Sequence, residues 1–173
     1  MTNSERLALS LIVLGVLSRL LPHPPNVTAV VGASLLAAHA IRNPWLAALV
    51  PVAIMALADI VLGWHGSALF TYAGMLATVA IGRGLLRSLS VLRLGAAALL
   101  SSLAFFLVSN FGVYLGGYYG LGLDGLVACY LAAIPFWGMS LVGDLGSTAL
   151  LFGLFVLARN TFVSANRSAA PQD

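Results

Sequence analysis

The sequence predicts an all-α integral membrane protein with about six transmembrane helices. Hydrophobic residues make up 61% of the chain and charged residues only 8%, and the mean hydropathy is +1.03. Soluble domains are about 45–50% apolar and about 25% charged. The apolar residues also form long runs, separated by short breaks of proline, glycine or arginine. We therefore expect the 173 residues to form a single transmembrane domain, 1–173, with no room for a soluble catalytic domain.

The apolar runs give the expected helices in order. The first run follows the polar start TNSER, lacks the cleavage site of a signal peptide, and ends before three prolines, which disfavour helix in the residues before them. Asn26 or Thr28 can cap the second run, and Pro51 is a candidate kink in the third. The expected spans are 7–21, 28–41, 45–62, 68–86, 94–112 and 139–159, followed by a flexible tail, 162–173.

The last apolar stretch is too long for one simple span. Residues 125–158 would form a straight helix of about 50 Å, against a hydrocarbon core of about 30 Å. Pro135, Gly138 and Gly143 are possible break points. We therefore expect a break near Pro135–Gly143, with a short outer helix at 125–133 before the sixth span. A seventh span is the alternative.

The basic residues indicate the topology, because positive charge accumulates in cytoplasmic loops. All eight are arginines. With six crossings and both termini inside, seven of them lie on the cytoplasmic side, and only Arg19 lies toward the outside. A seventh crossing would move Arg159 and Arg167 outside, and the opposite orientation would move seven arginines outside. We therefore expect both termini to be cytoplasmic.

The residues able to do chemistry collect on the outer side of this topology. Asp59 and Asp144 lie within apolar runs, where an ionisable group is costly unless it is paired or hydrated, so both are functional candidates. We expect Asp59, Asp144 and Asn110 to line one outward-facing cavity. The candidates near its mouth are His23, His65 and Tyr114, and the further substrate-binding candidates are Asn26, Tyr130 and Trp137.

Each candidate also has a structural alternative. Either aspartate can pair with Arg19, the aromatic side chains can be interface anchors, and the histidines can be solvated loop residues. Scattered His, Asp and Cys residues are a weak signal for a metal site, and the sequence has no serine-hydrolase, zinc-protease or Walker A motif. We expect no enzymatic activity, no bound metal and no cofactor. The few arginines, placed at segment ends, do not form a nucleic-acid surface.

A row of small residues occurs in the second run, at Ala29, Ala33 and Ala37. Such a row lets another helix approach closely. It fits packing within the chain, and it is also the candidate interface for a partner helix.

Five strings resemble those of an uncharacterised family of small bacterial membrane proteins, over nearly the whole chain: LPHPPN (21–26), DIVLGWH (59–65), NFGV (110–113), CYLAAIPF (129–136) and GDL (143–145). That family in turn is loosely similar to the substrate-binding S components of energy-coupling-factor vitamin transporters. S components are six-helix proteins with cytoplasmic termini, an outward pocket and a small-residue row that faces an ATPase-driven partner. This chain departs from them in carrying its alanine row on the second run.

The resemblance implies a multi-pass protein of the bacterial inner membrane, surrounded by the lipid bilayer. It would bind a small nutrient, either vitamin-like or a cationic or aromatic metabolite, and pass it inward with an ATPase-driven transmembrane partner or alone. One alternative is an assembly or scaffold protein without a substrate. A second is a transporter related to cobalamin or a metal, in which Cys129 would be offered as a cobalt ligand.

Overall fold

The computed structural model describes residues 1–168, with side chains through residue 161. Within this part the chain forms helices and no strands, which confirms the all-α class. The helices are α1 (Asn3–Leu20), α2 (Val30–Ala40), α3 (Pro44–Leu62), α4 (Ala68–Leu85), α5 (Val91–Leu115) and α6 (Leu123–Ser168). The tail expected at 162–173 is helical as far as Ser168, and its last five residues lie outside the described part.

Local signals in the sequence set several helix ends. Thr2 and Glu5 form a reciprocal capping box at the start of α1, which satisfies two free backbone N–H groups. Asn43 caps α3, and Ser90 caps α5. Gly63 ends α3 with φ of 94°, a conformation that favours glycine. The expected helix boundaries therefore agree with the structure to within a few residues at most of these ends.

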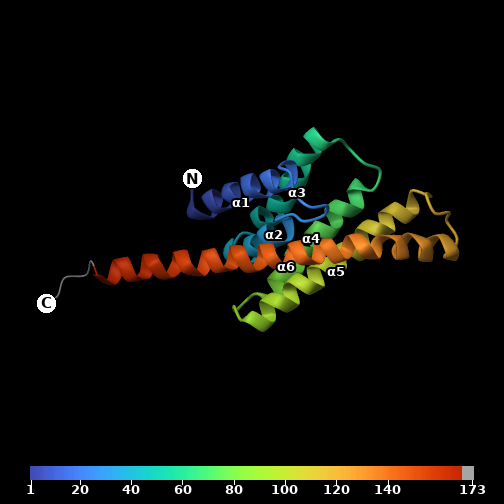
Figure 1. Cartoon of the computed structure of the whole chain (residues 1–173). Coiled ribbons are helices and arrows are strands. Elements are labelled where there is room, and N and C mark those ends of the chain that lie inside the picture. Colours follow the sequence, from blue (N-terminus) through green and yellow to red (C-terminus); the bar gives the residue numbers. More distant parts are fainter. Residues whose placement is uncertain (169–173) are drawn as a thin grey trace.

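The short helix α2 forms the centre of the bundle and contacts each of the other five helices. Its residues from Val30 to Ala38 are all buried. A Cβ atom added at Gly32 would lie 2.8 Å from the backbone of Ser147, so α2 and α6 approach as closely as their backbones allow. In Figure 1 the other helices surround α2, and α6 passes along it.

The alanine row of α2 packs inside the chain. Ala33 and Ala37 are 0% exposed. The prediction that this row faces a partner helix is therefore wrong for these two residues, and Ala29 is the half-buried N-cap residue of the same helix. Because α2 is surrounded on all sides, its small residues serve close internal packing.

The expected break in the last apolar stretch is also wrong. α6 is one continuous helix of 46 residues, with Pro135 inside it, so there is no separate outer helix at 125–133. A proline removes one backbone donor and crowds the preceding turn, but packing along a helix can outweigh this cost. α6 packs against both α2 and α5, which supply such support. At about 1.5 Å per residue the helix is about 69 Å long and exceeds the hydrocarbon core of about 30 Å.

Four helices of the described part are long and apolar enough to cross a membrane, namely α3, α4, α5 and α6. α2 is apolar but has only 11 residues, a length of about 17 Å, which is short of a full crossing. α1 has 18 residues but includes Glu5, Arg6 and Arg19. The six expected runs are therefore six helices, and four of them satisfy the criteria for a span.

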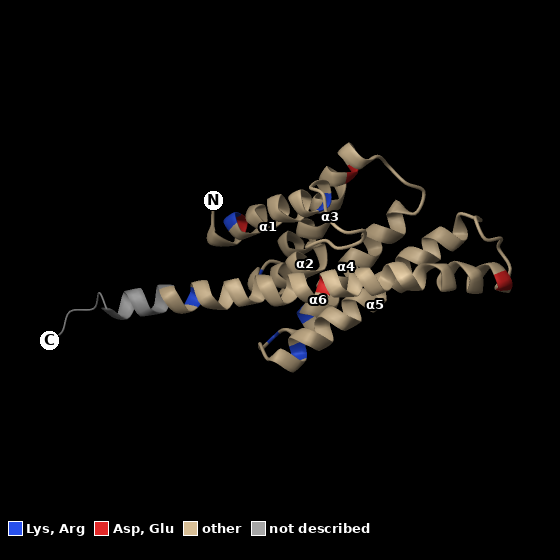
Figure 2. Cartoon of the chain, in the orientation of Figure 1, with Lys and Arg blue, Asp and Glu red and all other residues tan. Residues whose placement is uncertain are grey.

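Charged residues separate along the bundle. Figure 2 shows most blue segments on the side that holds the N-terminus, the loop between α4 and α5, and the C-terminal part of α6. The loop between α5 and α6 lies at the opposite end, and the first turn of α6 there carries a red segment, Asp124. This separation has the form that the positive-inside rule gives to a membrane protein.

Candidate functional site

Asp144 is a buried carboxylate on the middle part of α6. It is 5% exposed, and no cation lies within ion-pair distance of it in the described part of the chain. Trp137 Nε1 donates to the Ser102 hydroxyl at 3.2 Å, and the Ser102 side chain lies close to the Asp144 carboxylate. The bond between Trp137 and Ser102 joins α6 to α5 next to the carboxyl group.

Two adjoining cavities lie beside Asp144. The larger has a volume of about 220 Å³ and the smaller about 90 Å³, and both are lined by Asn26, Phe105 and Ser140. Asp144 lines the smaller cavity, together with Arg19. The larger cavity is lined also by Phe106, Ser109, Asn110, Ala133, Phe136 and Trp137. The protein thus has a charged chamber next to a cavity lined by four aromatic and four polar side chains.

The loop between α1 and α2 brings Asn26 to both cavities. Asn26 has φ of 63°, a left-handed conformation that asparagine tolerates better than most residues. Close to it in sequence, Val27 packs on Gly143 of α6, where an added Cβ would lie 2.9 Å from the Val27 Cα. The glycine directly before Asp144 therefore allows the loop to cover the carboxylate.

Aromatic rings form one wall of the larger cavity. Phe106 stacks on Trp137 with ring centroids 5.0 Å apart and an interplanar angle of 26°. Tyr130 meets Phe106 edge-on at 5.6 Å, and its hydroxyl donates to the Leu107 carbonyl at 2.7 Å. Tyr130 therefore supports the wall, and Trp137 lines the cavity itself. Ring faces carry negative potential and attract cations.

Asp59 has a different environment from Asp144. One carboxylate oxygen lies 3.3 Å from Nη2 of Arg19, and the other accepts a hydrogen bond from the Tyr72 hydroxyl at 3.0 Å. Asp59 lines neither of the two cavities. The pairing with Arg19 that was the structural alternative for the aspartates thus holds for Asp59.

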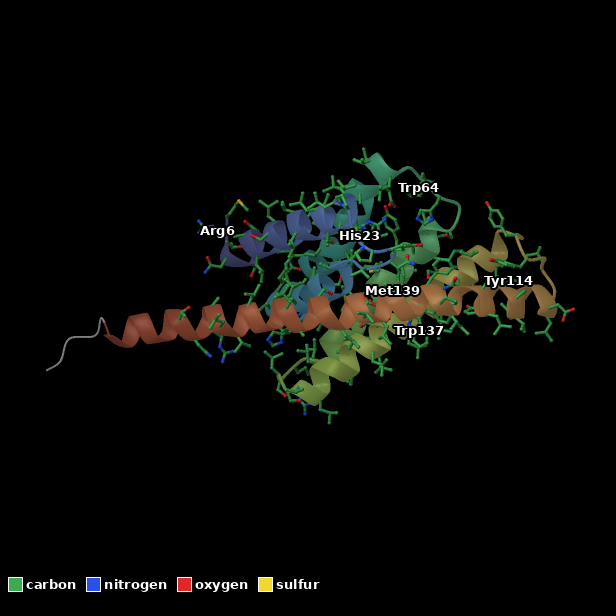
Figure 3. The ribbon with its side chains drawn as sticks, viewed as in Figure 1. Arg6, His23, Trp64, Tyr114, Trp137 and Met139 are labelled. Carbon is green, nitrogen blue, oxygen red and sulfur yellow. The ribbon has the colours of Figure 1, made fainter. Side chains whose placement is uncertain are left out.

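The structure places the other candidates apart from the cavities. His23 lies in an open surface hollow beside Gly143, and His65 lines a separate cavity of about 430 Å³ with Tyr118. The Tyr114 hydroxyl donates to the Leu121 carbonyl at 2.5 Å, near the loop after α5. In Figure 3, Trp137 lies on the α5 side of α6, His23 lies toward α1, and Tyr114 lies near the end of α5. The expected grouping of His23, His65 and Tyr114 at one mouth is therefore wrong.

Of the expected binding residues, the structure brings together Asn26, Asn110, Asp144 and Trp137. It adds residues that sequence reasoning did not select, namely Arg19, Phe105, Phe106, Ser109, Phe136 and Ser140. For two of them, Ser140 and Phe106, the spacing along the helix could have indicated a place in the site. Ser140 precedes Asp144 by four residues, and Phe106 precedes Asn110 by four, so each pair lies on one helix face.

Cys129 lies beside Asn110, one of the residues that line the larger cavity. The Cys129 thiol is buried and donates to the Asn110 carbonyl at 3.5 Å. Within the described residues, no three His, Cys, Asp or Glu side chains are grouped closely enough to hold a metal ion.

The fold and the cavities define an apolar helical bundle of the membrane type, with a partly open cavity lined by Arg19 and Asp144. Residues 2–168 match a family described as "Family of unknown function (DUF6580)", and the chain belongs to that family. No curated protein and no solved structure matches the chain. The expected membership in an uncharacterised family is thus confirmed, and the similarity to S components is not supported.

Proposed function

We propose that the protein binds a small solute with a positively charged group in the two adjoining cavities and passes it across the membrane. The observation that carries this proposal is the Asp144 carboxylate, which is buried beside a cavity without a cation partner. A buried unpaired charge in a membrane protein is costly and is typical of a substrate or ion pathway. A cationic ligand would remove that cost.

The aromatic wall supports the same ligand class. Phe106 and Trp137 present ring surface next to the chamber that holds Asp144. A desolvated cation near such rings gains about 1–2 kcal/mol. The cavities, of about 220 and 90 Å³, suit a metabolite-sized molecule and not a large cofactor.

The distribution of arginines supports entry from the outer side. If the arginine-rich ends are cytoplasmic, the loop that carries Asn26 lies toward the outside, as do the loops after α3 and α5. The solute would then enter beside that loop. With Ala33 and Ala37 buried, the alanine row of α2 is not available to an ATPase-driven partner, so we propose the binding step without one.

The test is the substitution Asp144→Asn with ligand-dependent melting in detergent as the readout. A panel of primary, quaternary and aromatic amines should contain compounds that raise the melting temperature of the wild type, since a ligand at 100 times its dissociation constant adds about 2.7 kcal/mol. Asp144→Asn should lose this shift and remain folded, because the amide keeps the shape of the carboxyl group.

Asp124→Asn is the matched control. It makes the same chemical change at an exposed residue in the first turn of α6, away from both cavities. It should leave the ligand shift intact. A panel without any stabilising amine would contradict the proposal and favour a scaffold protein without a substrate.

A further inference from the structure

The smaller cavity is lined by two opposite charges that do not pair with each other. Arg19 comes from α1 and Asp144 from α6, and the cavity of about 90 Å³ lies against both. In the described part of the chain the ion pair of Arg19 is with Asp59. A ligand in this chamber therefore meets a carboxylate and a guanidinium from different helices.

Arg19 keeps a spare hydrogen-bond donor. Its Nη2 atom faces Asp59, but its Nε atom is buried and has no hydrogen-bond partner among the described residues. A guanidinium carries five N–H donors, and a buried donor without an acceptor is destabilising. Because the Nε atom is closed off from the chamber, a ligand there would meet the Nη groups of Arg19, whose hydrogen bonds to the described residues are limited to the one with Asp59.

The charge balance of the chamber limits what this acceptor can be. With both carboxylates ionised, Arg19, Asp59 and Asp144 together carry one negative charge. A ligand with one positive charge makes the set neutral. A zwitterion would leave the negative charge in place and bring its own carboxylate into a chamber that already contains Asp144.

We propose that the ligand is a monovalent organic cation that carries a neutral hydrogen-bond acceptor next to its ammonium group. The ammonium faces Asp144, and the acceptor, such as a carbonyl or hydroxyl oxygen, accepts a hydrogen bond from a free Nη–H of the Arg19 guanidinium. Its apolar part lies against Phe106 and Trp137 in the larger cavity. This inference rests on the proposed function and narrows its substrate class.

The shared lining residues make this placement possible. Asn26, Phe105 and Ser140 border both cavities, so one molecule can extend from the charged chamber into the aromatic one. The smaller chamber suits a head group with its acceptor, and the larger one suits a ring or a branched alkyl group. The role of Arg19 is then to orient the head group while its pair with Asp59 holds it in position.

The experiment compares three matched compounds in calorimetric binding to the full chain in detergent. Phenylalaninamide has the ammonium and a neutral carbonyl, phenethylamine has only the ammonium, and phenylalanine is the zwitterion. The same three head groups are also compared on the side chains of tryptophan, leucine and alanine. The effect of the head group is thereby separated from the effect of side-chain size. We expect the amide to bind at least about tenfold more tightly than the amine, and the zwitterion to bind most weakly.

Arg19→Lys provides the protein-side arm. Lysine keeps the charge for Asp59 but has a single ammonium nitrogen, so it cannot bond Asp59 and the ligand through separate nitrogens. The variant should bind the amine as the wild type does and lose the preference for the amide, with its melting temperature measured to establish that it is folded. Arg93→Lys, on an exposed residue near the start of α5, is the matched control and should keep the preference.

Each outcome has a distinct meaning. Equal binding of amide and amine overturns the role of Arg19 as a donor to the ligand and leaves the proposed cation binding intact. Tightest binding of the zwitterion overturns the charge-balance argument. If no member of any series binds, the inference and the proposed function both fail.

Discussion

At the scale of single residues, the two buried aspartates differ in what surrounds them. Asp59 has a guanidinium and a phenol as partners, whereas Asp144 has a hydroxyl and a cavity. Both are 5% exposed, so burial alone does not distinguish them. The difference in partners assigns Asp59 to structure and leaves Asp144 as the group available to a ligand.

Asp59→Asn should therefore lower the stability of the ligand-free protein. It removes the charge that pairs with Arg19, and breaking such a pair should cost about 2–3 kcal/mol, less than for a fully buried pair. The Arg19 side chain is 19% exposed, which reduces the cost. Thermal melting in detergent, without ligand, measures the effect.

Tyr72→Phe provides a milder comparison, because it removes one hydrogen bond to the same carboxylate. It should lower the free energy of unfolding by about 1–2 kcal/mol. The order expected is a larger loss for Asp59→Asn than for Tyr72→Phe. An unchanged melting temperature for Asp59→Asn together with lost ligand binding would assign Asp59 to the site after all.

The residue scale also shows what the sequence could predict of the site. Asp144, Asn110, Asn26 and Trp137 could be selected because polar and aromatic groups in apolar runs are exceptional. Asp59 met the same criterion, and its pairing depends on how α1 packs against α3, which no local pattern encodes. Phe105 and Phe106 resemble any lipid-facing or core residue in sequence, so only the fold shows their place in the cavity.

At the scale of elements, α6 shows how tertiary packing overrides a local breaker. Length and Pro135 predicted a break, yet the helix is continuous. Pro135 is exposed, so its ring is not part of the core. α2 is shorter than its sequence predicted. The apolar run predicted a span, but the residues before Val30 form a loop, and the helix has only 11 residues.

Pro135→Ala should raise the melting temperature, because alanine restores one helical hydrogen bond and removes the ring clash while no buried packing is lost. Spin labels at the exposed positions Leu131 and Leu145 should be about 21 Å apart along the axis in both the variant and the parent chain. Pulsed electron spin resonance measures this separation. A markedly shorter distance in the parent, lengthened by the substitution, would indicate a break.

At the scale of the whole molecule, the arginines and the helix ends together make the orientation testable. The chain has a single cysteine, Cys129, which is buried. Introduced cysteines can therefore be labelled with little background. The loop between α4 and α5 and the loop between α5 and α6 lie at opposite ends of the bundle (Figure 1).

Ser88→Cys should react with a membrane-impermeant maleimide only after the cells are opened, because the arginine-rich loop is expected in the cytoplasm. Tyr118→Cys should react in intact cells. Tyr118 is 87% exposed, so accessibility does not limit the reaction. Labelling of both positions from the same side would contradict four complete crossings with alternating ends.

The central place of α2 has a consequence for how the chain is made. The helix appears early in synthesis, but the surface that packs on Gly32 belongs to Ser147, more than a hundred residues later. Until α6 emerges from the ribosome, an apolar helix too short to cross the bilayer lacks one of its main neighbours. Nascent chains stopped before α6 should therefore be substrates for membrane chaperones and quality-control proteases. Once the complete chain is released, packing of α6 on α2 should protect α2 from them.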